Sequence, residues 1–195
     1  MLTGELLARL QSLWQEGDQL DHATTLRHEK RLNITPDTGQ LLYQLVRHQR
    51  GGDILEIGTS NGYSTLWLAD AVRDTGGSLC TLEIDKARKK AARQNLREAK
   101  LEDFVRMEVC DAGEFLRDYS KYFDVVLLDA DRSQYTAYWP HLQRILTKPG
   151  SLLVVDNVLS HADEVQAFIA LVEADKNFSS MVLDIGAGLL LASSV

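Results

Sequence analysis

DILEIGTSNGYS, at residues 53–64, joins a short apolar run to a turn with two glycines and then to a helical pattern. An apolar run of this kind is typical of a strand that is buried on both faces. Gly58 and Gly62 allow the backbone to approach a ligand closely, and a helix that starts near Tyr63 and Ser64 attracts an anionic group. The segment predicts a strand, a ligand-binding turn and a helix.

The same alternation continues along the chain. Four more apolar runs follow, SLCTLEID (78–85), VRMEV (105–109), FDVVLLDA (123–130) and SLLVVDN (151–157). Helix-compatible patterns lie between the runs, at 64–72, 86–100, 114–118 and 133–146. Alternation of this kind predicts parallel βαβ units with right-handed crossovers.

The C-terminal stretch differs, because after a helical pattern at 162–175 it reads FSSMVLDIGAGLLLASSV (178–195). Two strand-like runs flank Ile185-Gly186-Ala187-Gly188 without a helix between them, which predicts an antiparallel hairpin at one edge of the sheet. We therefore expect a doubly wound, Rossmann-like α/β fold with a mostly parallel sheet of seven strands and helices on both faces.

Two helical patterns precede the sheet. The first has an apolar stripe of Leu6, Leu7, Leu10, Leu13 and Trp14, which we expect to be packing. The second covers 38–48, and Thr35-Pro36-Asp37 opens it. The 195 residues predict a single domain, with a helical cap at 1–50 and a ligand-binding core at 51–195.

Composition limits the partners. Hydrophobic residues make up 45% and charged residues 25%, which is ordinary for a globular protein. A net charge of −7 argues against broad affinity for nucleic acid, and the basic stretch at 86–100 is expected to be a solvated helix face. The apolar runs are too short to cross a bilayer, and we find no signal peptide. Because Cys80 and Cys110 do not form a disulfide framework, we expect a cytoplasmic protein.

An acid falls at or near the end of each expected parallel strand: Glu56, Glu83, Asp111, Asp129 and Asp156. The carboxyl ends of parallel strands share one edge of the sheet, where open α/β sheets bind their ligands. Five carboxylates there would raise each other's pKa unless cations or hydroxyl donors compensate them, and most have no Lys or Arg beside them. A positively charged ligand is the economical prediction.

The turn and the second acid narrow the class of ligand. The spacing Gly-x-x-x-Gly differs from the Gly-x-Gly-x-x-Gly of dinucleotide-binding proteins, which disfavours a nicotinamide-dependent oxidoreductase. Glu83, about one βα unit later, can accept both hydroxyls of an adenosine ribose. A ligand with a ribose, a carboxylate and a cationic centre matches S-adenosylmethionine.

The chain resembles the cation-dependent O-methyltransferases typified by the catechol and caffeoyl-CoA O-methyltransferases, and especially their small bacterial relatives. The resemblance covers residues 33–192. Its motifs are NITPDTGQLL, LEIGTSNGYS, LEID, CDAGEFL, VVLLDADRSQY, LLVVDNVL and IGAGLLL, in this order. The resemblance implies an S-adenosylmethionine-dependent O-methyltransferase that acts on a small hydroxylated acceptor, such as a catechol or phenol.

The resemblance also implies a site. The turn would surround the methionine end of the cofactor, Glu83 would hold the ribose, and Asp111 and Ala112 would border the adenine. The expected cofactor-binding residues are Glu56, Gly58, Thr59, Ser60, Gly62, Tyr63, Ser64, Glu83, Ile84, Asp111, Ala112 and Asp129. Asp129, Asp156 and Asn157 match the metal ligands, and their oxygens suit a hard divalent cation such as Mg²⁺. The alternative for Asp156-Asn157 is a strand-to-loop transition with an Asx turn.

Asp129 and Arg132 are the expected catalytic residues, and Arg132 departs from the family pattern, which has Lys there. A guanidinium effectively cannot act as a general base. Arg132 can instead orient the acceptor or stabilise its oxyanion; the alternative is a surface cation paired with Asp131. A second departure is Ala187, where many relatives have an acid.

Acceptor recognition is less determined. We expect the side chains of Tyr135, Tyr138 and Trp139 to pack in the core rather than to contact the acceptor. His161 is expected to be a lone exposed histidine. Arg27 and His28 are left open as contacts to the acceptor, the cofactor or a neighbouring subunit. Relatives suggest a homodimer.

Two rival functions remain from the sequence. One is a tRNA-modifying enzyme of the same superfamily that methylates a hydroxylated uridine, which the acidic balance disfavours. The other is a non-catalytic protein that binds S-adenosylmethionine. The departure at Arg132 favours that rival, whereas the intact set Asp129, Asp156 and Asn157 opposes it.

Overall fold

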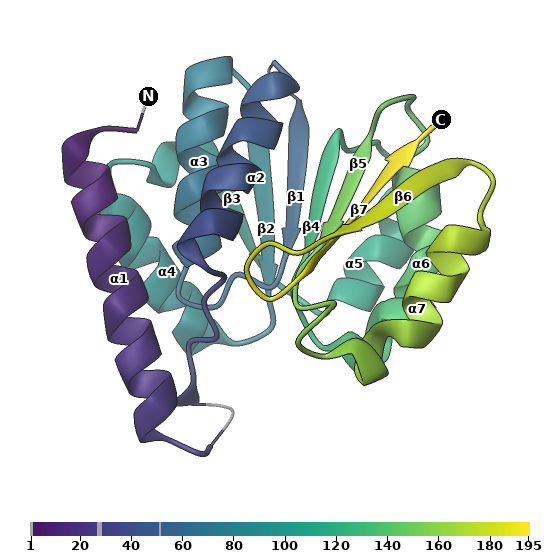
Figure 1. Cartoon of the computed structure of the whole chain (residues 1–195). Helices are drawn as coiled ribbons and strands as arrows, with labels where there is room; N and C mark the ends of the chain where they lie inside the picture. Colours follow the sequence, from purple (N-terminus) through teal and green to yellow (C-terminus); the bar gives the residue numbers. More distant parts are fainter. Residues whose placement is uncertain (1, 27–28, 51) are drawn as a thin grey trace.

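The computed structural model describes residues 2–26, 29–50 and 52–195. Within these residues, seven strands form one sheet in the order β3-β2-β1-β4-β5-β7-β6 (Figure 1). The strands are β1 Asp53–Ile57, β2 Ser78–Glu83, β3 Val105–Val109, β4 Val125–Leu128, β5 Leu152–Val155, β6 Phe178–Leu183 and β7 Leu189–Ser194. Strands β1 to β5 pair in parallel, and β7 is antiparallel to both β5 and β6. The predicted fold class is confirmed.

The strand order sets the position of the ligand crevice. The chain runs outward from β1 through β2 to β3, and then returns to place β4 on the other side of β1. Such a reversal leaves a crevice outside the carboxyl ends of the two strands where it occurs. The ends of β1 and β4 are therefore the expected centre of a site. The hairpin differs in one detail from a simple edge closure, because β7 lies between β5 and β6.

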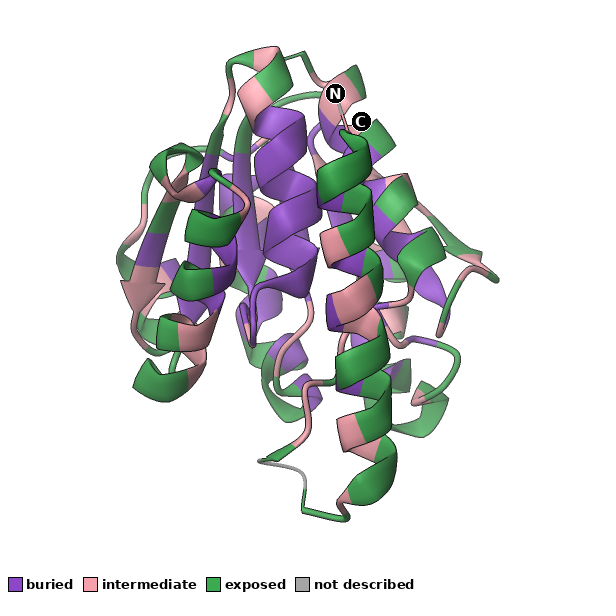
Figure 2. Cartoon of the chain, turned by 90° about the vertical axis from the view of Figure 1, so that its left-hand side faces the viewer, coloured by how far each residue is buried: buried purple, intermediate pink, exposed green. Residues whose placement is uncertain are grey.

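Helices cover both faces of the sheet. They are α1 Gly4–Ala23, α2 Pro36–His48, α3 Tyr63–Thr75, α4 Lys86–Glu98, α5 Ala112–Asp118, α6 Tyr135–Ile145 and α7 Ala162–Ala174, with the short 3₁₀ helices η2 Glu102–Phe104 and η3 Arg132–Gln134. Residues of α1 to α4 pack in one hydrophobic cluster, and residues of α5 to α7 pack in another on the opposite face. Helix α3 is buried along most of its length (Figure 2).

Helix α2 begins where Thr35-Pro36-Asp37 predicts. Thr35 caps α2 by accepting a hydrogen bond from the backbone of Thr38 at 3.3 Å, and Pro36 occupies the first helical position. The expected packing stripe of α1 is buried at Leu6, Leu10 and Leu13, whereas Leu7 is 44% exposed.

The structure also bears on the apolar helices and on the two cysteines. No helix in the described ranges has both the length and the apolar character needed to span a membrane. Cys80 and Cys110 are both free thiols; Cys80 is buried and Cys110 is half-buried.

Candidate functional site

The turn after β1 has two glycines whose conformations a larger residue would not adopt easily. Gly58 has a φ of +105°, and a Cβ there would lie 1.9 Å from the backbone oxygen of Asp129. Gly62, at the start of α3, has a φ of +85°, and its Cβ would lie 2.9 Å from the Cβ of Ala92. The glycine spacing thus serves close approach of β1 to β4 and of α3 to α4.

Most side chains of this turn are engaged inside the protein. The hydroxyl of Thr59 lies 2.5 Å from that of Thr81, and Ser64 donates a hydrogen bond to Glu56. Tyr63 is 2% exposed and packs edge-on against Trp67. These residues can therefore reach a ligand at the α3 N-terminus through their backbone groups.

Glu56 lies beneath the crevice rather than in it. Its carboxylate is fully buried and accepts hydrogen bonds from Ser64 at 2.5 Å and from Thr65 and Thr81 at 2.6 Å each. Burial raises the pKa of Glu56 to about 7 despite these three donors. Hydroxyls, and not a cation, compensate this acid, and its expected contact with a cofactor stays a prediction.

Glu83 closes the turn from the end of β2. One carboxylate oxygen accepts from the backbone N–H of Ser60 at 2.8 Å, and the other accepts from that of Asp85 at 2.9 Å. A carboxylate has about four lone-pair positions, so each oxygen can accept another donor, such as a ribose hydroxyl. Ile84, the next residue, is 70% exposed, which offers an apolar side chain beside Glu83.

Asp111 lies at the end of the neighbouring strand. The backbone N–H of Cys110 donates to the carbonyl of Glu83 at 3.2 Å, which joins the ends of β2 and β3. Asp111 is exposed and caps α5 by accepting from Glu114 N at 2.9 Å, and Ala112 is half-buried. Asp111 and Ala112 therefore border the same edge as Glu83.

The segment before α2 crosses the turn, a feature that sequence reasoning missed. Asp21, on α1, accepts hydrogen bonds from the backbone of Arg31 at 2.6 Å and of Leu32 at 2.8 Å. The hydroxyl of Ser60 in turn donates to the carbonyl of Arg31 at 2.8 Å. No local pattern could reveal this, since Asp21 acts on residues ten or more positions away.

Asp129 and Asp156 lie on neighbouring strand ends. Asp129 N bonds to the carbonyl of Ile57 at 3.0 Å, and Asp156 N bonds to that of Leu128 at 3.3 Å. Burial raises the pKa of both carboxyls, and the charges of Asp156 and Glu56 raise that of Asp129 further. Arg132 lowers both pKa values and the backbone N–H of Asn157 lowers that of Asp156, but burial outweighs them, so the charge of this pair of acids is compensated only in part.

The pair fits a divalent cation. Asp156 is 2% exposed, and its Oδ1 is buried without a hydrogen-bond partner in the described parts of the chain. Those parts bring no three His, Cys, Asp or Glu side chains together as a metal site, so the expected set needs the amide of Asn157 as its third ligand. Asn157 adopts a φ of +66°, and its side chain makes no hydrogen bond to any described residue.

Arg132 is not the surface cation that one sequence interpretation allowed. It is 8% exposed, and its Nε donates to Glu164 Oε2 on α7 at 2.8 Å. Asp131 instead caps η3 by accepting from the backbone of Ser133 at 3.1 Å. The interpretation was wrong because α7 supplies a carboxylate from 32 residues away, which no spacing near Arg132 indicates.

The aromatic residues after Arg132 are packing, as predicted. Tyr135, Tyr138 and Trp139 are all buried in the cluster beneath α6 and α7. Tyr135 has an additional role, because its hydroxyl accepts a hydrogen bond from the backbone N–H of Ala130 at 2.9 Å. It therefore braces the turn that follows Asp129.

His161 is not the lone exposed histidine that we expected. It is half-buried, and its Nδ1 lies 2.9 Å from the hydroxyl of Ser160. The same loop is fixed to the hairpin, since the carbonyl of Ala187 accepts from Leu159 N at 3.2 Å and from Ser160 N at 3.0 Å. The backbone carbonyl of Ala187 therefore holds the loop that follows Asn157.

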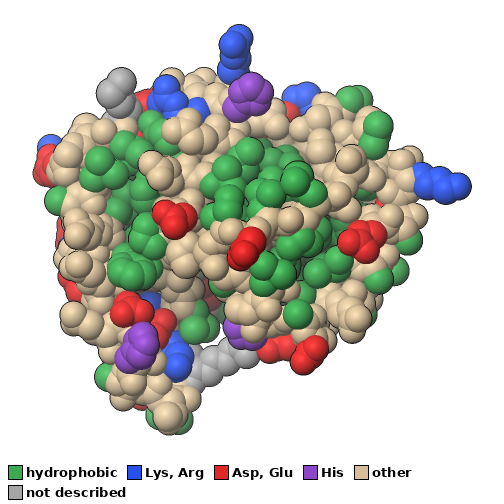
Figure 3. Space-filling view, in the orientation of Figure 1, with side chains coloured by type: hydrophobic (Ala, Val, Ile, Leu, Met, Phe, Trp, Pro, Cys, Tyr) green, Lys and Arg blue, Asp and Glu red, His purple; other side chains and the backbone are tan. Residues whose placement is uncertain are grey.

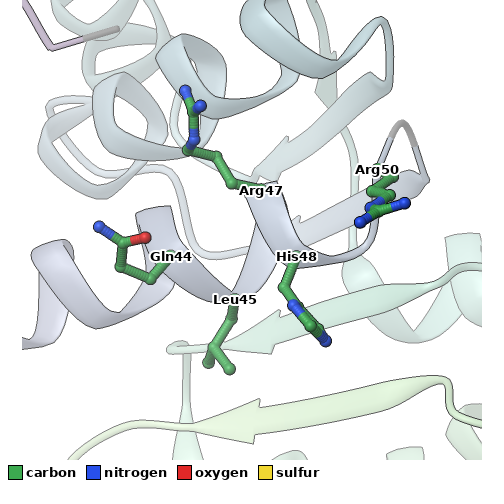
Figure 4. Close-up of a pocket in the computed structure, with 5 residues that line it drawn as sticks. All are labelled: Gln44, Leu45, Arg47, His48 and Arg50. Carbon is green, nitrogen blue, oxygen red and sulfur yellow. The ribbon is translucent and has the colours of Figure 1, made fainter.

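A separate hollow of about 480 Å³ lies at the C-terminal end of α2 (Figure 4). Its lining residues are Gln44, Leu45, Arg47, His48 and Arg50. Helix α2 leads into the start of β1, so this hollow flanks the opposite edge of the sheet from the acids. It does not belong to the candidate site.

Comparison with known proteins decides the family. A family model described as O-methyltransferase matches residues 15–193. The chain belongs to the O-methyltransferase family. It is 35% identical over 132 residues to a catechol O-methyltransferase of Niastella koreensis, and 36% identical over 132 residues to one of Mycobacterium tuberculosis. Each match covers 66% of this chain but only 59% and 58% of those relatives.

Solved O-methyltransferases share the whole architecture. A Bacillus cereus O-methyltransferase in complex with SAH is 27% identical, with a TM-score of 0.80, over 96% of this chain and 91% of that one. A Streptomyces achromogenes O-methyltransferase involved in tomaymycin synthesis, in complex with SAM, is also 27% identical, with a TM-score of 0.80, over 96% of this chain and 89% of that one.

Arg27 and His28, whose role the sequence leaves open, lie outside the described residues.

Proposed function

We propose that this O-methyltransferase transfers the methyl group of S-adenosylmethionine to a hydroxyl of a small catechol- or phenol-like acceptor, with help from a divalent cation. The observation that carries the proposal is the incompletely compensated pair Asp129 and Asp156, next to the glycine turn and Glu83. A sulfonium nucleoside and a hard cation would together neutralise this edge.

The proposed binding of S-adenosylmethionine rests on the turn after β1 and on related structures that contain SAM or SAH. Glu83 presents carboxylate oxygens, Ile84 presents an exposed apolar surface, and the N-terminus of α3 faces the same turn. Two related structures contain SAH or SAM. Asp111 and Ala112 would border the adenine.

The proposed role of a divalent cation rests on the charges around Asp129 and Asp156. Glu164 matches the charge of Arg132, so the guanidinium does not fully compensate Asp129 and Asp156. A divalent cation, held by these two carboxylates and Asn157, would supply the missing charge and lower the pKa of an acceptor hydroxyl.

The reaction is a displacement at carbon. The acceptor hydroxyl gives up its proton to water, its oxygen forms a bond to the methyl carbon, and the bond from that carbon to sulfur breaks to leave S-adenosylhomocysteine. The chain's own residues would hold the two reactants in line, and positioning of this kind can lower a barrier by about 7–11 kcal/mol. Tyr135 and Gly58 keep Asp129 in place for this alignment.

Calorimetry tests the proposal. S-adenosylmethionine is titrated into the wild type and into Asp156→Ala, with and without Mg²⁺. We expect micromolar cofactor affinity in both proteins and loss of Mg²⁺ binding in the variant. A wild type that ignores divalent cations would remove the metal from the proposal but leave the cofactor, whereas failure to bind the cofactor would remove the function.

We also propose that the protein works as a cytoplasmic homodimer. The free thiols Cys80 and Cys110 fit a reducing compartment. Hydrophobic side chains gather near the middle of the face shown in Figure 3, and Met181 on the outermost strand, β6, is 57% exposed. Exposed apolar surface of this kind is typical of contact sites. Sedimentation equilibrium of the wild type and of Met181→Lys tests the assembly.

A further inference from the structure

Arg132 is held at its Nε by an ion pair with Glu164. Its side chain is 7% exposed, whereas that of Glu164 is 50% exposed, so the ion pair opens to solvent on the Glu164 side. Only Nε of Arg132 bonds to Glu164, at 2.8 Å. An arginine held through Nε keeps its two terminal nitrogens as a planar fork of N–H donors.

The terminal nitrogens of Arg132 have no partner among the residues that the structure describes. Neither Nη1 nor Nη2 of Arg132 makes a hydrogen bond within residues 2–26, 29–50 and 52–195, and neither is among the unsatisfied polar atoms that are sealed from solvent. The guanidinium charge acts on Asp129 and on Asp156, which places it at the edge where the acceptor would bind. A cation with unused donors in this position is arranged to receive an anion.

We propose that Arg132, held by Glu164, binds a carboxylate carried by the methyl acceptor, so that hydroxylated carboxylic acids are the preferred acceptors. This inference rests on the proposed function, because it names the class of acceptor for the same site. A guanidinium fork matches the two oxygens of a carboxylate, which makes the bond both charged and directional. Glu164 is a positioning residue, since it acts through Arg132.

The test compares protocatechuate with its methyl ester, because the two share a catechol and differ in the carboxylate charge. Dissociation constants are measured by calorimetry with S-adenosylhomocysteine and Mg²⁺ present, so that no turnover occurs. We expect the wild type to bind the acid about 10- to 100-fold more tightly than the ester, the range of a charged hydrogen bond.

The variants separate recognition from folding. Arg132→Gln should bind acid and ester equally, and Arg132→Lys should keep part of the preference because it keeps the charge but loses the fork. Glu164→Gln should raise the KM for the acid while leaving the KM for the ester and the midpoint of unfolding close to wild type. Arg97→Gln, which breaks an exposed ion pair with Glu102, is the matched control and should keep the full preference.

The outcomes distinguish the two proposals. Equal binding of acid and ester by the wild type, or an unchanged preference in Arg132→Gln, overturns carboxylate recognition. Methyl transfer to the ester would still support the proposed function in that case. If the acid binds through Arg132 but neither compound is methylated, the anion site stands and the proposed function fails for this class of acceptor.

Discussion

At the scale of single residues, the site depends on which buried acid has a partner. Glu56 is satisfied by three hydroxyls, whereas Oδ1 of Asp156 has no partner in the described chain. Buried polar atoms are nearly always hydrogen-bonded, so an orphan beside a second carboxylate points to a missing ligand. The contacts of Glu56, and those of Tyr135 beside Asp129, each give a prediction at this scale.

The first prediction concerns the effect of Glu56 on stability at different pH values. Its pKa is raised from 4.5 to about 7, so the folded protein binds this proton more tightly than the unfolded chain. The carboxyl therefore adds stability as the pH falls from above 7 to below 4.5, by about 3 kcal/mol in total. Glu56→Gln cannot titrate and should lack this gain. Chemical unfolding across the pH range measures the difference, and parallel curves for the two proteins would contradict the prediction.

The second concerns Tyr135. Replacing it with Phe removes the hydroxyl that accepts from Ala130 N, and leaves a buried donor unsatisfied. We expect the free energy of unfolding to fall by about 1–3 kcal/mol. The control is Tyr122→Phe, because Tyr122 is 60% exposed and should change stability little. Urea denaturation of both variants compares them, and equal losses would show that the Tyr135 bond is not needed.

At the scale of elements, the turn from β1 into α3 is shaped by close contact. Gly58 brings β1 against the backbone of Asp129, and Gly62 brings α3 against α4. The segment fastened by Asp21 lies on the Ser60 side of the same turn. The surface around this turn, where we propose that the cofactor binds, is thus assembled from several elements around one short loop.

Substitution of Gly58 and, for comparison, of Gly76 tests the close contact at the turn from β1 into α3. Gly58→Ala combines a φ of +105° with a Cβ only 1.9 Å from Asp129 O, whereas Gly76→Ala has a φ of +74° and no atom within 4 Å of the Cβ. Gly76→Ala should cost about 1–2 kcal/mol for its backbone conformation. Gly58→Ala should cost clearly more and weaken S-adenosylmethionine binding. Thermal unfolding and calorimetry measure both, and similar behaviour of the two variants would disprove the close approach.

At the scale of the whole molecule, sheet topology gathers the charges. Reversal of strand order at β1 and β4 brings the ends of parallel strands to one edge, and that edge holds Glu83, Asp129 and Asp156. Since Glu56 and Asp156 both raise the pKa of Asp129, the acids act on one another across three strands. The protonation states of the acids in and beneath the crevice therefore depend on one another.

Cation binding should stabilise the whole fold in a pH-dependent way. Asp129 and Asp156 have raised pKa values, and a cation must displace their protons, so its affinity should fall as the pH falls. We expect Mg²⁺ to raise the Tm more at about pH 8 than at about pH 5, with a gain of about 3 kcal/mol at a hundredfold excess over Kd.

Calorimetric scans measure this shift, with NaCl at equal ionic strength as the control. Asp156→Asn should lose most of the Mg²⁺ effect at either pH, because the amide is neutral. A shift that is independent of pH, or one that NaCl reproduces, would mean that the cation does not bind through these carboxylates.

The sequence by itself determined the fold class, the edge that carries the acids, the position of the glycine turn and the family. Strand burial, helix caps and glycine positions are local properties, so runs such as 53–64 predict them well. Only the tertiary structure decided how each acid is compensated. Hydroxyls from α3 and β2 satisfy Glu56, α7 brings Glu164 to Arg132, and Asp156 keeps an oxygen without a partner. Partners of this kind are set by packing between elements that are distant in the chain, and residue spacing carries no record of that packing.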